Sequence, residues 1–370
     1  MIADLSIVVP TFNERANIPA LIERIATVLE GVSWEIIVVD DDSPDDTAAV
    51  VKAIAQHDPR IRCIRRVNRR GLSGACVEGI LSSSAPLVAV IDADLQHDEA
   101  VLPLMYASMR SGAADIAIAS RYIDATSVTS GLSRLRAQIS RCGTALAKRA
   151  FGIKCTDPMS GFFMLRRNFF DPLAPQLAES GYKILADILA SSRRPPRIAE
   201  FGFEFRARRA GQSKFDMRVA LDFLGLVINK ATAGLIPARF AAFAIVGGVG
   251  VIVHLAALQI AHAALATPHS YQRDLFAASQ TTATLVAMTT NFFINNAVTY
   301  RDLRIRGLSH LLRGLFIFYL ICALGAIANI SVATSLYDMS GRWLLPATAG
   351  IVMGSIWNFV LSSFFVWKRT

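Results

Sequence analysis

Four long apolar stretches without a charged side chain occupy most of the last 136 residues of the chain. A helix of about 20 residues, rising ~1.5 Å per residue, crosses the ~30 Å hydrocarbon layer of a bilayer. Each stretch is long enough to do so, although Gln280 and three asparagines dilute the second one. We therefore predict an all-α membrane domain of four transmembrane helices within residues 235–370, at Phe240–Ile260, Leu275–Tyr300, Gly314–Leu336 and Leu344–Val366.

Charged residues are distributed unevenly between the two parts of the chain. The last 136 residues hold nine basic and three acidic side chains, whereas the first 234 hold 29 basic and 26 acidic ones. Only the first part has the charge density of a soluble domain, which is about a quarter. This split explains a chain that is 18% charged with a mean hydropathy of +0.42. It excludes both a purely soluble enzyme and a purely membrane-embedded protein.

Basic residues in the short loops predict the orientation of the helices. The loop between the second and third stretches is rich in arginine, and Lys368 and Arg369 follow the fourth stretch. The other two loops each hold one basic and one acidic residue. Because positive loops face the cytoplasm, we expect a multi-pass protein with both termini cytoplasmic. No basic segment precedes Ile7-Val8-Val9, so we expect no signal peptide and a cytoplasmic front domain.

A polar stripe precedes the first apolar stretch. Lys214, Arg218, Asp222 and Lys230 recur at near-helical spacing, and apolar residues fill the other faces. The pattern is typical of an amphipathic helix in the headgroup plane, and the alternative is an ordinary surface helix. We expect an interfacial helix over residues 214–234, between a cytoplasmic domain (1–213) and the membrane domain (235–370).

The second and fourth apolar stretches end alike. Asn291-Phe292 precedes Tyr300-Arg301, and Asn358-Phe359 precedes Trp367-Lys368 at the same offsets. This similarity predicts two related hairpins. In each hairpin, the aromatic–basic pair is expected to anchor the helix at the membrane interface, and the asparagine is expected to form a hydrogen bond to another helix. The mid-span asparagines have two explanations, which are helix packing alone and a groove that handles lipid.

Short apolar runs alternate with helical stretches in the front domain. The runs predict buried strands at Ser6–Pro10, Ile36–Asp40, Ile61–Arg65, Leu87–Asp92 and Asp115–Ser120. The segments between them predict helices at Asn17–Leu29, Thr47–Gln56 and Ser73–Ser82. This alternation is typical of an α/β fold with a mostly parallel sheet. Such sheets bind ligands beyond the carboxyl ends of their strands, where polar clusters stand in this chain.

The motif Asp92-x-Asp94-x-Gln96 directly follows the apolar run Val88–Ile91. Oxygen ligands at alternate positions of an extended segment can meet a hard divalent cation, with diphosphate oxygens and water completing its shell. Aspartates also cap helices that follow strands, but the buried strand before the motif and the glutamine in step favour a metal. We predict that these three residues bind a hard divalent cation.

Two further strand ends predict a nucleotide site. Asp40-Asp41 follows one predicted strand and Pro10–Glu14 follows another. A helix cap also explains the two aspartates, but the two segments together favour a grip on the base and ribose of a nucleotide. No G-x-x-x-x-G-K-[ST] loop is present, which argues against a P-loop ATPase.

Basic residues gather beyond the predicted sheet. They are Arg121, Arg134, Arg136, Arg141, Arg206, Arg208, Arg209 and Lys214. Such a run is typical of a solvated or membrane-facing surface, and the planar fork of arginine also suits phosphate oxygens. Stacking aromatics are sparse among these residues and no nucleic-acid motif is present, so we expect no nucleic-acid partner.

Six motifs in order carry a family resemblance across about residues 5–220. They are Val9–Glu14, Val38–Thr47, Ile91–His97, Ser120-Arg121-Tyr122, Asp157–Phe162 and Gly211–Lys214. This part resembles the family 2 glycosyltransferases of the dolichol-phosphate mannosyltransferase type. The back half resembles the GtrA-like four-helix membrane family, through Arg239-Phe240 and the two related stretch ends.

The resemblance implies a GT-A fold and metal-dependent, inverting transfer from a nucleotide sugar to a polyprenyl monophosphate. It implies that Asp92, Asp94 and Gln96 hold Mg²⁺ or Mn²⁺ against the donor diphosphate. The implied donor pocket comprises Pro10, Phe12, Glu14, Val38, Asp40, Asp41, Asp92, Ala93, Asp94 and Gln96. Arg121 and Arg134, with Ser133 nearby, would bind the acceptor phosphate, and Arg209 and Lys214 would close over the donor.

The chain departs from the family pattern in three places. Phe12 stands where tyrosine is common, Asp42 and Asp46 replace an asparagine and a glycine, and the segment 124–131 lacks a glycine run. These departures concern the donor base and the acceptor loop. We expect GDP-mannose as the donor, and the alternative is a UDP-sugar such as UDP-glucose or UDP-GlcNAc. A translocator of lipid-linked sugars with a regulatory front domain is the competing class.

Overall fold

The computed structural model of the chain contains two compact units, Met1–Gly234 and Leu235–Thr370. The structure describes residues 3–123, 148–149, 152–177, 183–192, 194–203, 206, 225, 227–230, 232, 235–265, 272–340 and 344–368. Most of the predicted interfacial helix over residues 214–234 lies outside these ranges and stays a prediction.

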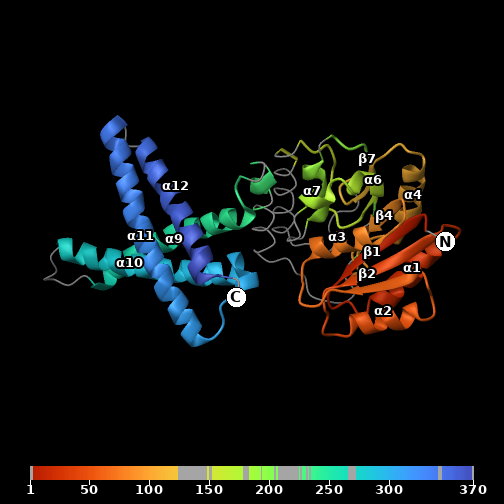
Figure 1. Cartoon of the computed structure of the whole chain (residues 1–370), viewed down its shortest axis with the longest axis horizontal. Coiled ribbons are helices and arrows are strands. Elements are labelled where there is room, and N and C mark those ends of the chain that lie inside the picture. The colour runs from red at the N-terminus through yellow and green to blue at the C-terminus, as the bar shows by residue number, and fades with distance from the viewer. Residues whose placement is uncertain are drawn as a thin grey trace. The chain divides into compact units, whose positions relative to one another are not determined.

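Unit 1 is built on a seven-stranded sheet with the order β3-β2-β1-β4-β6-β5-β7 (Figure 1). The strands are β1 (Leu5–Thr11), β2 (Trp34–Asp40), β3 (Ile61–Arg65), β4 (Leu87–Val90), β5 (Ile116–Ser120), β6 (Phe163–Arg166) and β7 (Ile198–Gly202). Every pairing is parallel except the two made by β6. The mostly parallel α/β fold is thus confirmed, and the carboxyl ends of β1 to β5 meet at one edge.

Helices cover both faces of the sheet, so the strands are buried on both sides. Successive residues of β1 point to opposite faces, with Ile7 and Val9 in one core and Val8 in the other. Figure 1 shows α2 and α3 on opposite sides of the strands. The first core contains α1 (Ile18–Val28), α2 (Thr47–Ala55) and α4 (Leu102–Arg110), and the second contains α3 (Leu72–Ser82), α6 (Arg167–Phe170) and α7 (Ile184–Ser191).

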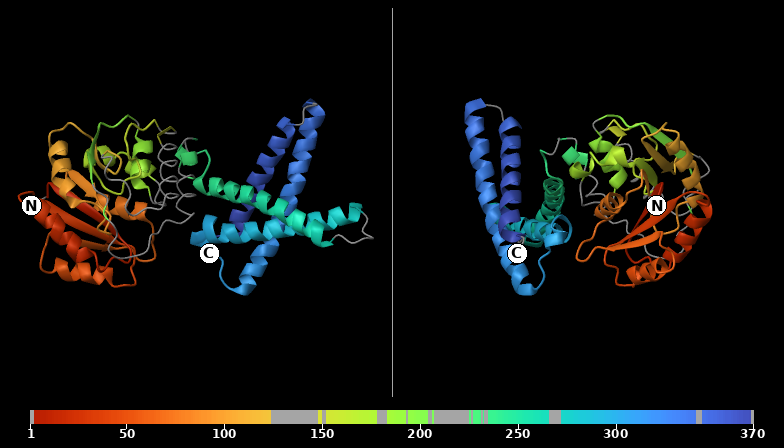
Figure 2. Two further views of the ribbon diagram at one scale, coloured as in Figure 1. Left: turned by 180° about the vertical axis from the view of Figure 1, so that it is seen from behind. Right: turned by 45° about the vertical axis from the view of Figure 1, so that its right-hand side comes forward.

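Unit 2 contains four long helices in its described residues. They are α9 (Ala238–Leu265), α10 (Gln272–Ile294), α11 (Leu308–Ser340) and α12 (Leu344–Leu361). Each predicted apolar stretch begins in one of them, although the second and fourth stretches run past the ends of α10 and α12. α9 pairs with α10 as α11 pairs with α12 (Figure 2). Of the helices described, α9 and the part Leu308–Ile327 of α11 are long and apolar enough to cross a membrane.

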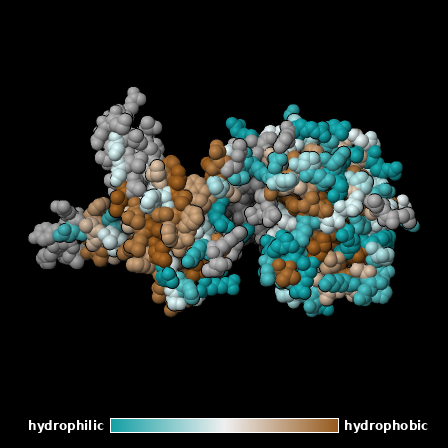
Figure 3. Space-filling model, in the orientation of Figure 1, coloured by the Kyte–Doolittle hydropathy of each residue, from teal (hydrophilic) through white to brown (hydrophobic). Residues whose placement is uncertain are grey.

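The surface of unit 2 is apolar where a soluble protein would be polar (Figure 3). Large side chains of α9 such as Ile252 and Ile260 are 68% and 70% exposed, and Phe316 of α11 is 63% exposed. Exposed apolar surface of this extent marks an interaction site or a membrane-facing surface. It agrees with the prediction of a membrane domain.

The two hairpins meet in an aromatic cluster. α10 and α12 each end in a π-helical turn, Asn295–Thr299 and Ser362–Val366, and each turn is followed by an aromatic residue. The rings of Tyr300 and Trp367 stack with centroids 4.2 Å apart, and Trp367 donates a 3.0 Å hydrogen bond to Asn296. Both rings are fully buried. They bind the hairpins together, whereas the sequence had predicted anchors that face the headgroups.

Candidate active site

A cavity of about 470 Å³ opens at the carboxyl edge of the sheet. Its lining includes seven of the residues predicted from the sequence, namely Pro10, Phe12, Glu14, Asp41, Asp92, Ala93 and Asp94. The rest of the lining is Thr11 of β1 and four residues of one segment, Arg70, Gly71, Leu72 and Ala75. Four segments that are far apart in the sequence therefore form one site.

The remaining predicted residues lie outside this lining. Val38 is fully buried within β2, and Gln96 donates its side-chain amide to the carbonyl of Arg206 over 3.1 Å. Asp40 is also fully buried and accepts hydrogen bonds from the hydroxyls of Thr11 and Ser43. Asp40 thereby ties the loop after β1 to the loop after β2. Ser133, Arg134, Arg209 and Lys214 lie outside the described residues.

The acidic loop after β4 presents two carboxylates to the cavity. The Asp92 side chain is 35% exposed, and its Oδ2 lies 3.3 Å from Nε2 of the buried His97. Asp94 Oδ1 accepts the backbone N–H of Gln96 at 3.2 Å. Between them, Leu95 has a φ of 61°, a conformation that a bulky residue rarely adopts. The loop is held in this strained form by the fold around it.

Asp92 and Asp94 fit a hard divalent cation as donors, because both are carboxylates in one polar cavity. Within the described part of the chain, no cluster of three or more His, Cys, Asp or Glu side chains is placed to hold a metal by itself. Mg²⁺ is commonly bound by one or two carboxylates, with substrate phosphates and waters completing its shell. The donor set therefore fits a cation that is shared with a phosphorylated ligand.

Strained residues cluster at this edge of the sheet. In the described residues, positive φ outside glycine occurs at Asn13, Asp42, Asp46, Asn68 and Leu95. These residues follow β1, β2, β3 and β4, at the ends that face the cavity. Residues in such conformations cost about 1–3 kcal/mol each and concentrate at functional sites. Their distribution marks the same edge as the polar motifs do.

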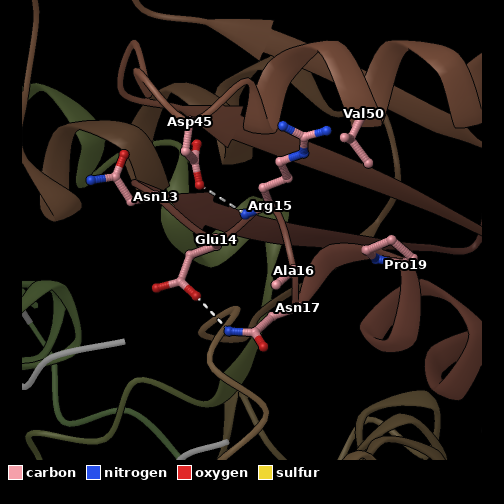
Figure 4. Close-up of a pocket in the computed structure, with 8 residues that line it drawn as sticks. All are labelled: Asn13, Glu14, Arg15, Ala16, Asn17, Pro19, Asp45 and Val50. Atoms are coloured by element: carbon pink, nitrogen blue, oxygen red, sulfur yellow. Dashed lines mark hydrogen bonds between the residues drawn. The ribbon is translucent and has the colours of Figure 1, made fainter. Parts of the chain in front are cut away.

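The loop after β1 is braced from outside the cavity. Asn17 donates a 2.8 Å hydrogen bond to Glu14, and the backbone N–H of Arg15 donates to Asp45 at 3.2 Å (Figure 4). A second cavity of about 420 Å³ lies beside this loop, with Val50 of α2 at its wall. The brace holds the segment that carries Phe12 and Glu14.

The segment after β3 was missed by reasoning from the sequence. Its Arg66 forms a 2.6 Å ion pair with Asp41 and is itself buried, and the Arg70 guanidinium lies 4.5 Å from the centre of the Phe12 ring. Burial raises the pKa of Asp41, although the Gly71 N–H and Arg66 oppose the rise. Gly71 reaches Asp41 with a φ of 148°, which favours glycine. The arginines within residues 65–70 were the feature of the sequence that could have indicated this segment.

Arg121 is held by a fully buried carboxylate. Its Nε and Nη2 donate to Asp157 at 2.7 and 3.0 Å in a bidentate pair, and Asp157 has no exposed side-chain surface. Burial lowers the pKa of Arg121, but attraction to Asp157 outweighs burial and the pKa is raised. Arg121 therefore stays a cation at the end of β5.

Two residues near the Arg121–Asp157 ion pair also interact with the acidic loop after β4. Gly161 packs directly against the carboxylate of Asp92, so that a methyl group at Gly161 would collide with it. Lys183, just before α7, has a pKa lowered by burial and by repulsion from Arg121, and attraction to Asp157 and Asp92 opposes this. Lys183 was also missed, because a single lysine before an apolar helix carries no distinctive pattern.

The chain matches two family models. Residues 6–173 match glycosyl transferase family 2, and residues 242–367 match the GtrA/DPMS transmembrane domain. The chain is thus a family 2 glycosyltransferase joined to a membrane domain. A dolichol-phosphate mannosyltransferase of Pyrococcus furiosus is 31% identical over 98% of this chain and 99% of its own length. The chain belongs to the dolichol-phosphate mannosyltransferase family.

Further comparisons cover the front part. A dolichol-phosphate mannosyltransferase of Saccharomyces cerevisiae is 32% identical over 60% of this chain and 85% of its own length. Among solved structures, glucosyl-3-phosphoglycerate synthase of Mycobacterium tuberculosis in complex with Mn²⁺, UDP-glucose and phosphoglyceric acid matches with a TM-score of 0.50. It is 21% identical and covers 62% of this chain and 80% of its own. This likeness confirms the fold.

Proposed function

We propose that the chain transfers mannose from GDP-mannose to a polyprenyl monophosphate at the cytoplasmic face of a membrane, with inversion at the sugar. The relatives named dolichol-phosphate mannosyltransferase support this proposal. The observation that carries it is the meeting of Asp92 and Asp94 with Phe12 and Asp41 in one cavity. This set offers acidic ligands for a cation and a pocket for a nucleoside.

The donor occupies the cavity in this proposal. Phe12 and Asp41 contact the nucleoside, and Asp40 keeps their two loops in register through Thr11. Arg70 stands over the Phe12 ring and offers a planar fork to the donor phosphates. Arg209 and Lys214, which lie outside the described residues, are proposed to cover the diphosphate.

A divalent cation, Mg²⁺ or Mn²⁺, supplies charge stabilisation to the departing nucleoside diphosphate when it is bound. Asp92 and Asp94 are the proposed ligands, with Gln96 as the third. His97 keeps Asp92 in place, because its Nε2 contacts that carboxylate and its ring packs against Phe162 at 5.5 Å. We therefore assign His97 to positioning and not to proton transfer.

The acceptor needs no protein base. A phosphate monoester has its second pKa at about 6 and is an anionic nucleophile at neutral pH. One of its oxygens attacks the anomeric carbon as the bond from that carbon to the nucleoside diphosphate breaks. Arg121, oriented by Asp157, is proposed to hold the acceptor phosphate together with Ser133 and Arg134. Positioning of two anions by fixed cations is the main contribution of the protein.

The membrane part keeps the acceptor near the site in this proposal. Four helices span the bilayer, both termini face the cytoplasm, and the segment 214–234 lies at the headgroup level. The exposed apolar surfaces of α9 and α11 support a place for these two helices in the bilayer.

Substitution of one ligand tests the proposal. We expect Asp94→Ala to reduce mannolipid synthesis by about 100-fold or more, since stabilisation of the leaving group is worth several kcal/mol. Glu23→Ala, which removes an exposed carboxylate on α1, serves as the matched control and retains activity. Electron paramagnetic resonance of Mn²⁺ in the presence of GDP measures cation binding in both variants. Unchanged synthesis in Asp94→Ala would contradict the role of Asp94 as a ligand, and no synthesis by the unsubstituted chain would favour the translocator class.

A further inference from the structure

A third cavity lies in unit 2, away from the glycosyltransferase site in the sequence. It has a volume of about 340 Å³ and is formed by the loop after α10, the first turns of α11 and the end of α12. Four of its lining residues are basic or ionisable to a cation, namely Arg306, His310, Arg313 and Lys368. Ile305 and Phe365 contribute an apolar wall.

We propose that this cavity binds the headgroup phosphate of an anionic phospholipid, with the acyl chains lying along α11 and α12. The proposed lipid is distinct from the acceptor of the transfer reaction. Basic pockets between transmembrane helices are suited to anionic headgroups, because the phosphate meets several cations at once. The inference depends on the membrane assignment of unit 2 and is independent of the proposed sugar transfer.

No acidic residue is among the described residues that line the cavity. Within the described residues, no Asp or Glu side chain forms an ion pair with Arg306, Arg313 or Lys368. The orientation of a membrane protein depends on how many basic residues each loop holds. Basic residues with this role alone do not have to lie close together in the fold. Here two separate segments, 303–317 and 365–368, bring their cations to one hollow. That convergence distinguishes a binding site from a general surplus of charge.

The apolar part of the cavity favours a lipid over a free phosphate. Phe365 is 60% exposed and its neighbour Phe364 is 69% exposed, and Leu312 and Phe316 of α11 are also exposed. Within the cavity itself, Leu303, Ile305, Ile317 and Phe365 place apolar side chains beside the cations. A ligand with a charged head and apolar chains matches both features, whereas inorganic phosphate matches only the first.

Two arginines of one loop provide a matched test. Arg306 lines the cavity, whereas Arg304 lies two residues earlier, is also exposed and does not line it. Full-length protein is purified in a neutral detergent and titrated with short-chain phosphatidylglycerol, and bound lipid is counted by native mass spectrometry. Each cation near the headgroup is worth about 1 kcal/mol, or about five-fold in affinity.

We expect Arg306→Gln to weaken phosphatidylglycerol binding about five-fold and Arg306→Gln/Arg313→Gln about 25-fold. Arg304→Gln should bind within about two-fold of the unsubstituted chain, and Arg306→Lys/Arg313→Lys should retain most of the affinity, which shows that the loss comes from charge and not from misfolding. Phosphatidylcholine should bind weakly to all of them.

Three results would overturn the proposal. The first is equal loss of binding in Arg304→Gln and Arg306→Gln. The second is competition by inorganic phosphate as strong as that by the lipid. The third is displacement of phosphatidylglycerol by an equimolar polyprenyl monophosphate, which would make the cavity part of the acceptor route.

Discussion

At the scale of single residues, the site depends on contacts between carboxylates and groups that fix them. Asp157 is fully buried and holds Arg121 in a bidentate pair, and Gly161, four residues later, touches Asp92. One short segment therefore positions both the proposed acceptor cation and a proposed metal ligand. Removal of one partner from a buried ion pair typically costs about 3–5 kcal/mol.

Gly161→Ala tests this coupling. The added methyl group would collide with the Asp92 carboxylate, and we expect Mn²⁺ affinity in the presence of GDP to fall about ten-fold or more. Gly112→Ala is the control, because Gly112 has a φ of 79° and open space around it. That variant should lose about 1 kcal/mol of stability and keep its Mn²⁺ affinity. Equal Mn²⁺ affinities in the two variants would contradict the coupling.

The sequence predicted some site residues well because their pattern is local. Asp92 and Asp94 stand directly after a buried strand, so their neighbours in the sequence reveal their place in the fold. Arg70 and Lys183 reach the site from other segments, and only the folded chain brings them near. Asp40 was predicted in the donor pocket by its position after β2, but its carboxylate bonds to Thr11 and Ser43 beneath the lining.

At the scale of elements, the parallel strands were the most predictable part. β1 to β5 coincide with the apolar runs to within a few residues, because strands buried on both faces consist of continuous apolar residues. β6 and β7 were missed. β6 has four residues and runs directly into α6, so its apolar pattern does not distinguish a strand from the start of a helix. β7 packs at an edge and is only half-buried.

The two helix pairs of unit 2 share one packing arrangement, in which an asparagine lies against a glycine of the neighbouring helix. Asn291 of α10 lies against Gly250 of α9, and Asn358 of α12 lies against Gly325 of α11. Both asparagine Oδ1 atoms are buried without a hydrogen-bond partner in the described residues, although the sequence had predicted such a bond. Small residues allow close approach of helices in a membrane. The two hairpins are thus related in packing as well as in sequence.

Gly250→Ala is expected to separate α9 from α10, because its methyl group would collide with Asn291. Overpacking of this kind costs about 1–3 kcal/mol, and the unfolding temperature of the full chain in detergent should fall. Gly248→Ala is the matched control, since nothing lies within 4 Å of a methyl group there. It should leave that temperature unchanged or raise it slightly through better helix propensity. A fall of equal size in both variants would contradict the packing argument.

At the scale of the whole molecule, the charge distribution differs between the glycosyltransferase unit and the membrane unit. The first 234 residues carry an excess of three positive charges and the last 136 carry an excess of six, which together give the net charge of +9. In unit 1, buried pairs such as Arg66 with Asp41 shape the cavity. In unit 2, basic residues gather at the ends of the helices and around the third cavity.

One measurement tests the central claim most directly. Purified full-length protein is incubated with Mn²⁺, a polyprenyl monophosphate and, in parallel, radiolabelled GDP-mannose, UDP-glucose and UDP-GlcNAc, and label in the lipid extract is counted. We predict label from GDP-mannose that depends on both the lipid and the cation, and little from the UDP-sugars. Label from a UDP-sugar alone would contradict the proposed donor, and no label from any donor would contradict sugar transfer to the lipid.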